Sequence, residues 1–506
     1  MNIKAALTKA SYKVIQGNPD MEVEDVVYDS RKAGPGCVFV CMVGAVTDSH
    51  RFFDQVVSQG CSAFVIERPL NEEQLKSLPE NVTVLQAEHS RQALALLSAA
   101  RFDYPAKRMI CIGVTGTKGK TTATYMIKAI LERDGKKAGL IGTAGAVIGD
   151  NTYPTRNTTP ESYELHQYFA QMVKEGCDYM IMEVSSQGLK MHRVDGIEFD
   201  YAIFTNISLD HVGPNEHESF KEYLYYKSQL FNQCKVGILN RDDPHFEEVL
   251  NHIRKENTRL YTYGLETEAD FKAKEIQYVS KPDFVGLDFQ VQSLLEAKPF
   301  PVRVNIPGKF NVSNAMAAVC VCCFLNIPRK QMNHALEHLY VNGRMEIVYS
   351  SKRCTVLVDY AHNAVSMESL LLTLRDYHPK RLVCVFGCGG NRSKDRRYSM
   401  GEIGGKLADL CILTADNSRD ERVEDILTDI RGSIEKTGGA FIEIPDRKEA
   451  IEHSIIHSRE GDMIAVIGKG HEDYQEICGV RYPFLDRQVI EEVVKKLESG
   501  ELSWKE

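Results

Sequence analysis

The chain has 506 residues, more than a single hydrophobic core usually accommodates, so three domains of ordinary size are expected. Its 43% hydrophobic and 26% charged residues are typical of a globular protein, and a formal net charge of -9 gives no electrostatic reason to expect nucleic acid or an anionic membrane as a partner. The 14 cysteines are scattered and no apolar run approaches membrane-spanning length, which predicts a cytoplasmic protein with reduced thiols.

Residues 1–107 predict a small α/β domain. Short runs rich in β-branched residues alternate with helix-like segments, and the domain is expected to end just after Tyr104-Pro105. The predicted strands cover residues 25–28, 37–42, 63–67 and 82–86.

Residues 108–341 predict a second α/β domain, which opens with a strand at 109–114 and a helix at 123–132. The glycine-rich turn between them aims backbone N–H groups and the positive end of a helix dipole at one point, which suits a nucleotide polyphosphate. Lys120 is then expected to reach the β- and γ-phosphates and Thr121 to offer its hydroxyl to Mg²⁺. The turn is a variant, because Val114 stands where the standard pattern has its first glycine.

Continuous apolar runs at 179–184, 201–205 and 236–240 predict further strands of a parallel sheet covered on both faces. Glu183 lies at the end of the first run, and His211 follows the second. Ligands of an open α/β sheet bind at the carboxyl ends of its strands, so both residues are candidates to reach a Mg-nucleotide. The alternative is that Glu183 caps a turn and that His211 is a hydrogen-bonded loop histidine.

Residues 342–506 predict a third domain, a Rossmann-like α/β unit that follows a β-rich patch at 283–304. Strands and helices alternate again. The predicted strands cover residues 355–359, 381–387, 410–415, 440–444 and 462–468.

Motifs in order along nearly the whole chain resemble those of the Mur ligases. They are Gly116-Thr-Lys-Gly-Lys-Thr121, Glu183-Val-Ser-Ser186, Thr205-Asn-Ile-Ser-Leu-Asp-His211, Tyr226-Lys-Ser-Gln-Leu-Phe231, Asn311-Val-Ser-Asn314, Gly343-Arg-Met345, Asp359-Tyr-Ala-His362 and Gly468-Lys-Gly-His-Glu472. Within that family the chain is most similar to the members that add the third amino acid of the peptidoglycan stem peptide. The resemblance implies a central P-loop ATPase domain, flanked by an N-terminal domain that binds the UDP-sugar and a C-terminal domain that binds the amino acid.

The resemblance implies a ligase that uses ATP to activate the D-glutamate carboxylate of UDP-N-acetylmuramoyl-L-alanyl-D-glutamate as an acyl phosphate. Lys120, Glu183, His211 and Lys227 are the implied catalytic residues, and Lys227 matches a lysine that the family carries as a carbamate (N6-carboxylysine). Thr121, Glu183, His211 and the Lys227 carbamate would hold two Mg²⁺ ions. The implied ATP-binding residues are Gly116, Thr117, Lys118, Gly119, Lys120, Thr121, Thr122, Asn311 and Arg344.

The nucleotide-sugar contacts implied by the resemblance lie in the first two domains. They are Ser30, His50, Asn157, Thr158, Thr159, Ser185 and Arg193. Met191 departs from the family pattern, because relatives often carry a polar residue there.

The third domain is expected to choose the amino acid through Arg392, Asp416, Asn417, Ser418, Arg419, Gly468 and Glu472. Members that add meso-diaminopimelate read Asp-Asn-Pro-Arg where this chain reads Asp416-Asn-Ser-Arg419. Because a guanidinium grips the far carboxylate of diaminopimelate and repels the ammonium of lysine, diaminopimelate is favoured over lysine. Ser418, Asn391 and Ser393 depart from the pattern. Arg419 as a solvated surface charge remains the alternative.

Three functions are compatible with the sequence. The first is the ligase described, expected to act as a monomer without inserting into a membrane. The second is a related ligase, such as one that polyglutamylates folate, although the complete first domain and residues 416–419 argue against it. The third is a P-loop nucleotide switch or a catalytically idle binding protein, which need not keep Glu183, His211, Lys227 and Glu472 together.

Overall fold

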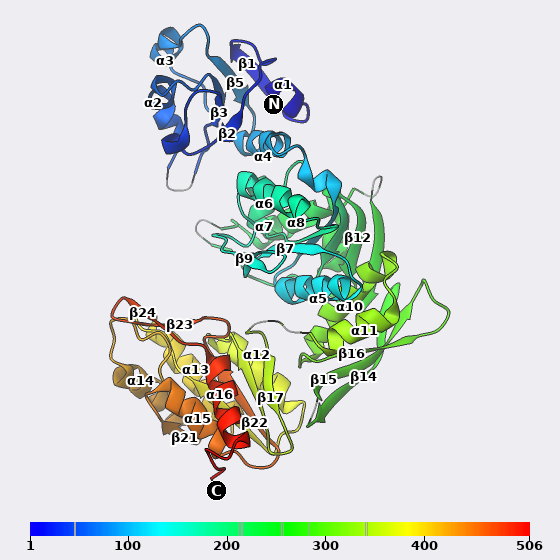
Figure 1. Ribbon diagram of the computed structural model, residues 1–506, viewed down its shortest axis with the longest axis vertical. Coiled ribbons are helices and arrows are strands. Elements are labelled where there is room, and N and C mark those ends of the chain that lie inside the picture. The colour runs from blue at the N-terminus through cyan, green and yellow to red at the C-terminus, as the bar shows by residue number, and fades with distance from the viewer. Residues whose placement is uncertain are drawn as a thin grey trace. The chain divides into compact units, whose positions relative to one another are not determined.

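The structure is a computed structural model that describes residues 1–506 except 45–46, 211, 214–215, 255, 257, 283, 340, 342 and 506 (Figure 1). It divides into two compact units. The first contains Met1–Lys272 and Met316–Pro328, and the second contains Ala273–Ala315 and Arg329–Glu506. Among the described residues, no helix is both long and apolar enough to cross a membrane.

The first unit opens with a mostly parallel sheet in the order β1-β5-β4-β3-β2, in which β1 is the antiparallel edge. Apolar clusters cover the sheet from helices α1, α2 and α4, so residues 1–107 bury a core of their own. The elements are α1 (Ile3–Ala6), β1 (Tyr12–Gln16), β2 (Asp25–Val27), β3 (Cys37–Val40), α2 (Phe53–Ser58), β4 (Ala63–Ile66), α3 (Glu72–Ser77), β5 (Thr83–Ala87) and α4 (Ser90–Arg101).

The rest of the first unit is a parallel sheet in the order β13-β12-β11-β6-β10-β7, continued by the antiparallel strands β8 and β9. Its elements are β6 (Ile110–Thr115), α5 (Lys120–Arg133), β7 (Ala138–Gly142), β8 (Gly145–Ile148), β9 (Asn151–Tyr153), α6 (Ser162–Lys174), β10 (Tyr179–Glu183), α7 (Ser186–Lys190), β11 (Phe199–Phe204), α8 (Phe220–Gln229), β12 (Cys234–Asn240), α9 (Phe246–Asn251) and β13 (Arg259–Gly264). Strand β6 lies between β10 and β11, so the ends of these three strands meet at one edge.

The second unit begins within β14 (Phe271–Lys281), which leads to the antiparallel pair β15 (Phe284–Ser293) and β16 (Phe300–Val304). Helix α10 (Lys309–Phe324) carries the chain into the first unit, and the second unit resumes at Arg329. Helix α11 (Arg329–Glu337) then packs on β16.

The main sheet of the second unit has the order β17-β18-β22-β19-β20-β21, in which β17 is the antiparallel edge. Helices α15 and α16 pack on one face, and α12 and α13 pack on the other. The elements are β17 (Glu346–Ser350), β18 (Cys354–Asp359), α12 (Ala364–Arg375), β19 (Arg381–Phe386), α13 (Lys394–Leu407), β20 (Leu410–Leu413), α14 (Val423–Thr437), β21 (Phe441–Glu443), α15 (Arg447–Ile456), β22 (Asp462–Ile467), β23 (Tyr474–Ile477), β24 (Val480–Pro483) and α16 (Asp486–Glu498).

These sheets confirm the predicted α/β class, with the P-loop strand at the centre of a parallel sheet. Helix α5 begins at Lys120, three residues before the predicted start, because Gly119 caps it in a left-handed conformation. Strand β22 ends at Ile467, since Gly468 turns the chain with φ of +112°.

His166 on α6 is buried among apolar side chains, and its ring lies 5.5 Å, centroid to centroid, from that of Phe169. Neither ring nitrogen has a hydrogen-bond partner among the residues that the structure describes. Burial lowers the pKa of His166 from 6.5 to about 3. The folded chain therefore keeps this imidazole neutral at pH values where the unfolded chain protonates it.

We expect the free energy of unfolding of the variant His166→Leu to depend less on pH than that of the wild type. Because the folded pKa is depressed, the wild-type chain loses stability as the pH falls from 6.5 toward 3, by about 2 kcal/mol between pH 7 and pH 5. Urea unfolding of both proteins at these two pH values measures the difference. The exposed His252→Leu is the matched control and should follow the wild type. An equal loss in His166→Leu and wild type would contradict the assignment.

Candidate functional site

The phosphate loop joins β6 to α5 and depends on two glycines. Gly116 has φ of +147°, and a Cβ there would lie 1.9 Å from the Thr205 hydroxyl oxygen. Gly119 has φ of +84°, which favours glycine. Lys120 Nζ folds back over the loop and donates to the carbonyl oxygens of Gly116 (2.9 Å) and Thr117 (3.0 Å). The predicted loop residues therefore form one compact turn at a helix N-terminus.

Asn206 clamps this loop, although the sequence did not single it out as a site residue. Its backbone carbonyl accepts from the Thr117 N–H at 2.8 Å, and its side-chain oxygen accepts from the Lys118 N–H at 2.9 Å. Its amide donates to the Lys118 carbonyl at 2.9 Å. The available signal was its position two residues after the apolar run that forms β11.

Glu183 ends β10 and is 1% exposed. Its Oε1 accepts hydrogen bonds from the Thr121 hydroxyl at 2.9 Å and the Thr143 N–H at 3.0 Å. A Cβ at Gly142 would lie 2.3 Å from the same oxygen, so glycine on the neighbouring strand β7 leaves the space that the Glu183 carboxylate occupies. Thr143 and Gly142 are further site residues that the sequence did not mark.

The Thr121 hydroxyl and the Glu183 carboxylate are adjacent hard oxygen ligands, and this donor pair fits Mg²⁺. Among the described residues, no group of three or more histidine, cysteine, aspartate or glutamate side chains is arranged to hold a metal ion. His211, the predicted ligand of a second ion, lies outside the described residues.

Lys227 on α8 is 2% exposed and lies against the phosphate loop. Its Nζ donates to the Gly116 carbonyl at 2.6 Å and sits 4.6 Å from the centroid of the Tyr223 ring. Burial, and next the charge of Lys120, hold the pKa of Lys227 well below its usual value. The structure thus brings Lys120, Thr121, Glu183 and Lys227 together around one loop.

The loop at 157–159 approaches the same strand end. Thr158 accepts from or donates to Thr143 at 3.1 Å, hydroxyl to hydroxyl, and Thr159 donates to the Glu183 carbonyl at 2.9 Å. The Ser185 N–H donates to the Thr159 hydroxyl oxygen at 2.9 Å, while the Ser185 hydroxyl caps α7. These predicted substrate contacts are therefore adjacent to Glu183.

Arg193 is already engaged by the protein. Its Nε donates to Glu161 Oε1 at 2.8 Å, and its Nη1 donates to the Thr159 carbonyl at 3.1 Å. Arg91 on α4 contacts the other oxygen of Glu161 at 3.2 Å. Glu161 thus pairs with Arg91, which follows the N-terminal sheet, and with Arg193 of the central sheet region.

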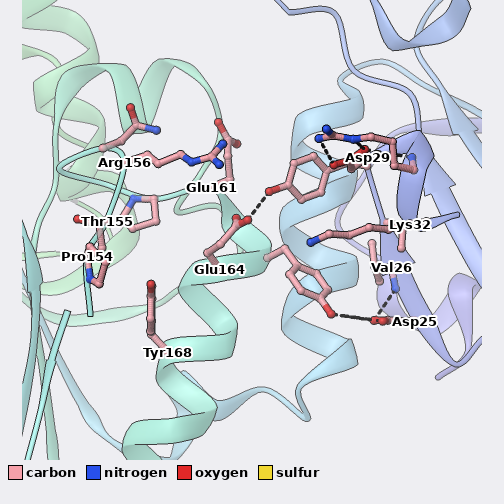
Figure 2. Close-up of a pocket in the computed structure, with 16 residues that line it drawn as sticks. Asp25, Val26, Asp29, Lys32, Pro154, Thr155, Arg156, Glu161, Glu164 and Tyr168 are labelled. Carbon is pink, nitrogen blue, oxygen red and sulfur yellow. Dashed lines mark hydrogen bonds and ion pairs between the residues drawn. The ribbon is translucent and has the colours of Figure 1, made fainter. Parts of the chain in front are cut away.

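A cavity of about 610 Å³ lies beside this cluster, between β2 and the N-terminal half of α6 (Figure 2). Two tyrosine–carboxylate hydrogen bonds cross it in opposite directions: Tyr28 donates to Glu164, and Tyr163 donates to Asp25 at 3.1 Å. Asn157 is part of its lining. These bonds join residues 1–107 to the central sheet region.

Ser30 lines a second cavity of about 680 Å³ on the N-terminal domain. His50 makes both of its ring contacts within that domain: Nδ1 lies 2.6 Å from Asp48 Oδ1, and Nε2 accepts from the N–H groups of Glu67 (3.0 Å) and Arg68 (3.1 Å). The ring nitrogens therefore fix the loop, and a ligand at His50 would meet the ring face or edge.

In the second unit, Asn311 lies in the first turn of α10, and Arg344 lies in the bend before β17. Asn311 is buried, and its amide donates to the Pro307 carbonyl at 2.6 Å. The Arg344 guanidinium lies 5.4 Å from the centroid of the Tyr360 ring. Asn311 thus supports the start of α10, whereas Arg344 presents a partly exposed cation.

The loop after β20 meets the loop after β22 in a buried polar cluster. The Asn417 amide donates to Glu472 Oε2 at 2.8 Å, and Lys469 Nζ donates to Asn417 Oδ1 (3.2 Å) and Glu472 Oε2 (3.3 Å). Asp416 Oδ1 lies 3.9 Å from Lys469 Nζ, and a Cβ at Gly468 would lie 3.0 Å from Asp416 Oδ2. Lys469 is fully buried and is the residue of this cluster that the sequence did not predict.

Arg419 follows in the same loop, with φ of +50°. Its Nη1 donates to the Gly390 carbonyl at 2.7 Å, and its Nε lies 3.6 Å from Glu476 Oε2. The side chain is 24% exposed, so it is partly buried rather than fully solvated. Arg392 is exposed, and both arginines lie close to Gly389. A Cβ on Gly389 would lie 3.9 Å from the Arg392 Cγ and 3.4 Å from the Arg419 Nη1.

A buried ion pair supports these loops from below. Arg447 on α15 forms two hydrogen bonds of 2.7 Å with Asp486 on α16, and both side chains are fully buried. The remaining guanidinium donors reach the carbonyls of Ala415 (3.2 Å) and Ile467 (3.0 Å). These residues immediately precede Asp416 and Gly468, so the pair fixes the start of both loops.

We expect Asp486→Asn to lower the free energy of unfolding by about 3–5 kcal/mol, because it leaves the buried Arg447 guanidinium without its hydrogen-bonded countercharge. Chemical denaturation of the variant and wild type measures the loss. The control Glu492→Gln removes the partly exposed partner of Lys448 and should cost less than about 1 kcal/mol. Equally small losses of unfolding free energy in the two variants would show that the buried pair contributes little to stability.

Two family models match the chain: the Mur ligase middle domain over residues 114–322 and the Mur ligase glutamate ligase domain over residues 343–470. A UDP-N-acetylmuramoyl-L-alanyl-D-glutamate–2,6-diaminopimelate ligase of Caldanaerobacter subterraneus subsp. tengcongensis is 40% identical over 493 residues, which cover 97% of this chain and 99% of the relative. The enzyme of the same name from Clostridium botulinum is 38% identical over 500 residues, or 98% and 100% of the two chains.

Solved structures give the same relationship. A structure named as UDP-N-acetylmuramoyl-L-alanyl-D-glutamate–2,6-diaminopimelate ligase superposes with a TM-score of 0.77 at 27% identity, covering 98% of this chain and 99% of the other. Folylpolyglutamate synthase of Mycobacterium tuberculosis, complexed with ADP and AMPPCP, reaches a TM-score of 0.57 at 17% identity over 75% and 92% of the two chains. The second likeness shows the fold alone.

Proposed function

Because the chain belongs to the Mur ligase family, we propose that it joins meso-2,6-diaminopimelate to UDP-N-acetylmuramoyl-L-alanyl-D-glutamate and converts ATP to ADP and phosphate. The observation that carries this proposal is the buried Lys227 at the phosphate loop, beside Thr121 and Glu183. A simple nucleotide switch has no need of a buried lysine with a lowered pKa at that point.

The reaction has two steps. A carboxylate oxygen of the D-glutamate residue attacks the γ-phosphorus of ATP, which forms an acyl phosphate and expels ADP. The amine of the incoming amino acid then attacks the acyl carbon, and the tetrahedral intermediate expels phosphate and loses a proton. The protein positions the reactants and neutralises the transferring phosphoryl group through Lys120 and the loop N–H groups.

Thr121 and Glu183 are proposed to hold one Mg²⁺, and His211 a second ion. When bound, Mg²⁺ neutralises charge on the β- and γ-phosphate oxygens. The Thr121–Glu183 hydrogen bond keeps both oxygen ligands at the start of α5, where the nucleotide phosphates would lie.

Lys227 is proposed to carry a carbamate. Its unprotonated amine would attack CO₂ and lose one proton, which replaces a cationic group by an anionic oxygen ligand. The low pKa supports this step, since only the free amine is nucleophilic. The Lys227 Nζ is also close to the loop, at 2.6 Å from the Gly116 carbonyl.

The acceptor is proposed to bind to the loops after β19, β20 and β22. Arg419 and Arg392 supply guanidinium groups for carboxylates, while Glu472, Asn417 and Asp416 supply acceptors for ammonium groups. Gly468 leaves room beside Asp416, and Ser418, which directly precedes Arg419, is buried. This balance of charges suits an amino acid with a carboxylate at its far end.

The nucleotide-sugar is proposed to contact Ser30, His50, Asn157, Thr158, Thr159, Ser185 and Arg193, and ATP to contact Asn311 and Arg344 besides the phosphate loop. This assignment corresponds to domains at 1–107, 108–341 and 342–506. The independent apolar core of residues 1–107 supports the first boundary. We propose a monomer.

A phosphate-release assay with the full chain tests the function. We expect release only when ATP, Mg²⁺, UDP-N-acetylmuramoyl-L-alanyl-D-glutamate and an amino acid are all present, with meso-diaminopimelate preferred to L-lysine and L-ornithine. Preference for lysine would support the second candidate, the same reaction with a different acceptor. Release with ATP alone, or none at all, would exclude the ligase and favour a nucleotide-binding protein.

A further inference from the structure

Tyr360 lies in the motif Asp359-Tyr-Ala-His362, to which the proposed reaction gives no role. It directly follows β18 and is partly buried, and its ring lies near those of His362 (4.7 Å) and His471 (5.1 Å, centroid to centroid). Its ring faces the Arg344 guanidinium at 5.4 Å, and its hydroxyl donates to Glu472 Oε1 at 3.5 Å. One side chain therefore contacts a proposed ATP residue and a proposed amino-acid residue.

The backbone around Tyr360 holds the loop that contains Gly343 and Arg344 against the loop that contains Gly470 and Glu472. Its N–H donates to the Gly343 carbonyl at 3.0 Å, and a Cβ at Gly470 would lie 2.7 Å from the Tyr360 Cβ. A Cβ at Gly343 would lie 2.3 Å from the backbone nitrogen of His471. With φ of +65° at Gly343 and +53° at Gly470, the loops pack backbone against backbone.

The chemistry of the side chain matches both contacts. A cation within about 6 Å of an aromatic face is attracted by the ring, and Arg344 meets that condition. Burial, and next the Glu472 charge, raise the pKa of Tyr360, so the hydroxyl stays protonated and can donate. At 3.5 Å the hydrogen bond is long, so the hydroxyl orients the Glu472 carboxylate without holding it tightly.

We infer that Tyr360 is a positioning residue that aligns Arg344 for the nucleotide with its ring and Glu472 for the amino acid with its hydroxyl. The inference rests on the proposed function, since both partners are assigned there. The ring and the hydroxyl are separable, because phenylalanine keeps the first and removes the second.

Kinetics of phosphate release by the full chain test the two roles. Tyr360→Phe should raise KM for meso-diaminopimelate about fivefold while KM for ATP stays within twofold of the wild type. Tyr360→Leu should raise both constants, that for ATP about threefold. Neither change requires a large fall in kcat, because neither group touches the reacting atoms.

The control Tyr398→Phe removes the hydroxyl of an exposed tyrosine on α13 and should change neither constant. A tyrosine that only packs predicts a silent Tyr360→Phe and a Tyr360→Leu that lowers thermal stability but leaves both KM values unchanged; either result overturns the inference. Equal rises in both constants for Tyr360→Phe also overturn it. If the wild type needs no amino acid for phosphate release, the proposed function fails first, which is a different result.

Discussion

Replacement of Lys227 by alanine is expected to reduce the rate of phosphate release roughly 10³-fold, with partial recovery on addition of formate or acetate. The wild-type side chain is buried at the phosphate loop, and its lowered pKa leaves the amine free to take up CO₂. Alanine removes the proposed anionic ligand and leaves a space that a short carboxylate fits. Turnover measured against carboxylate concentration, with circular dichroism as a check on folding, gives the result.

Lys221→Ala is the matched control, since Lys221 lies on the same helix but is exposed. It should keep wild-type activity and gain nothing from added carboxylate. Removing dissolved CO₂ should lower wild-type activity and leave the Lys227→Ala background unchanged. Full activity of Lys227→Ala would mean that no carbamate is needed.

The burial of Lys227 shows why part of the site could not be predicted from local sequence. An isolated lysine on a helix is expected to be exposed, and only the resemblance to a family assigned it a role. Its Nζ donates to the loop carbonyl of Gly116, which is 111 residues away in the sequence. Lys469 was missed for the same reason, because its partner Asn417 is 52 residues away.

The strands that carry the site were predictable because their signal is local. Strands buried on both faces read as continuous apolar runs, and β6, β10, β11 and β22 appear where those runs stand. The polar residues that follow them then fall at the carboxyl edge. The hairpin β23–β24 was missed because its strands are mostly polar and exposed, with a tight turn at Cys478-Gly479.

The protein partners of the predicted site arginines could not be predicted from the sequence. Arg193 was predicted to contact the nucleotide-sugar, yet its Nε and Nη2 edge faces Glu161. A substrate carboxylate or phosphate would therefore replace Glu161 or use the remaining donors. Arg419 is paired less tightly with a carboxylate than Arg193 is. Its Nη1 donates to a neutral carbonyl, and its Nε lies 3.6 Å from Glu476.

This arrangement of Arg419 predicts the amino-acid preference. Arg419→Met is expected to lower kcat/KM for meso-diaminopimelate roughly 10²-fold, because a bidentate, charge-assisted pair with the far carboxylate is lost. L-lysine carries an ammonium at that end and is repelled by the wild-type guanidinium, so its kcat/KM should stay constant or rise. Parallel phosphate-release assays with the two amino acids measure the ratio.

The backbone of Arg419 provides the competing explanation, and the same assay separates the two. Its φ of +50° is held by the hairpin, since its N–H donates to the Glu476 carbonyl at 2.9 Å and its carbonyl accepts from the Cys478 N–H at 2.8 Å. If methionine only disturbed this strained turn, activity with both amino acids would fall equally. Arg422→Met, at an exposed arginine three residues further on, should leave the ratio unchanged. A loss confined to diaminopimelate therefore identifies recognition of the far carboxylate by the guanidinium rather than support of the loop.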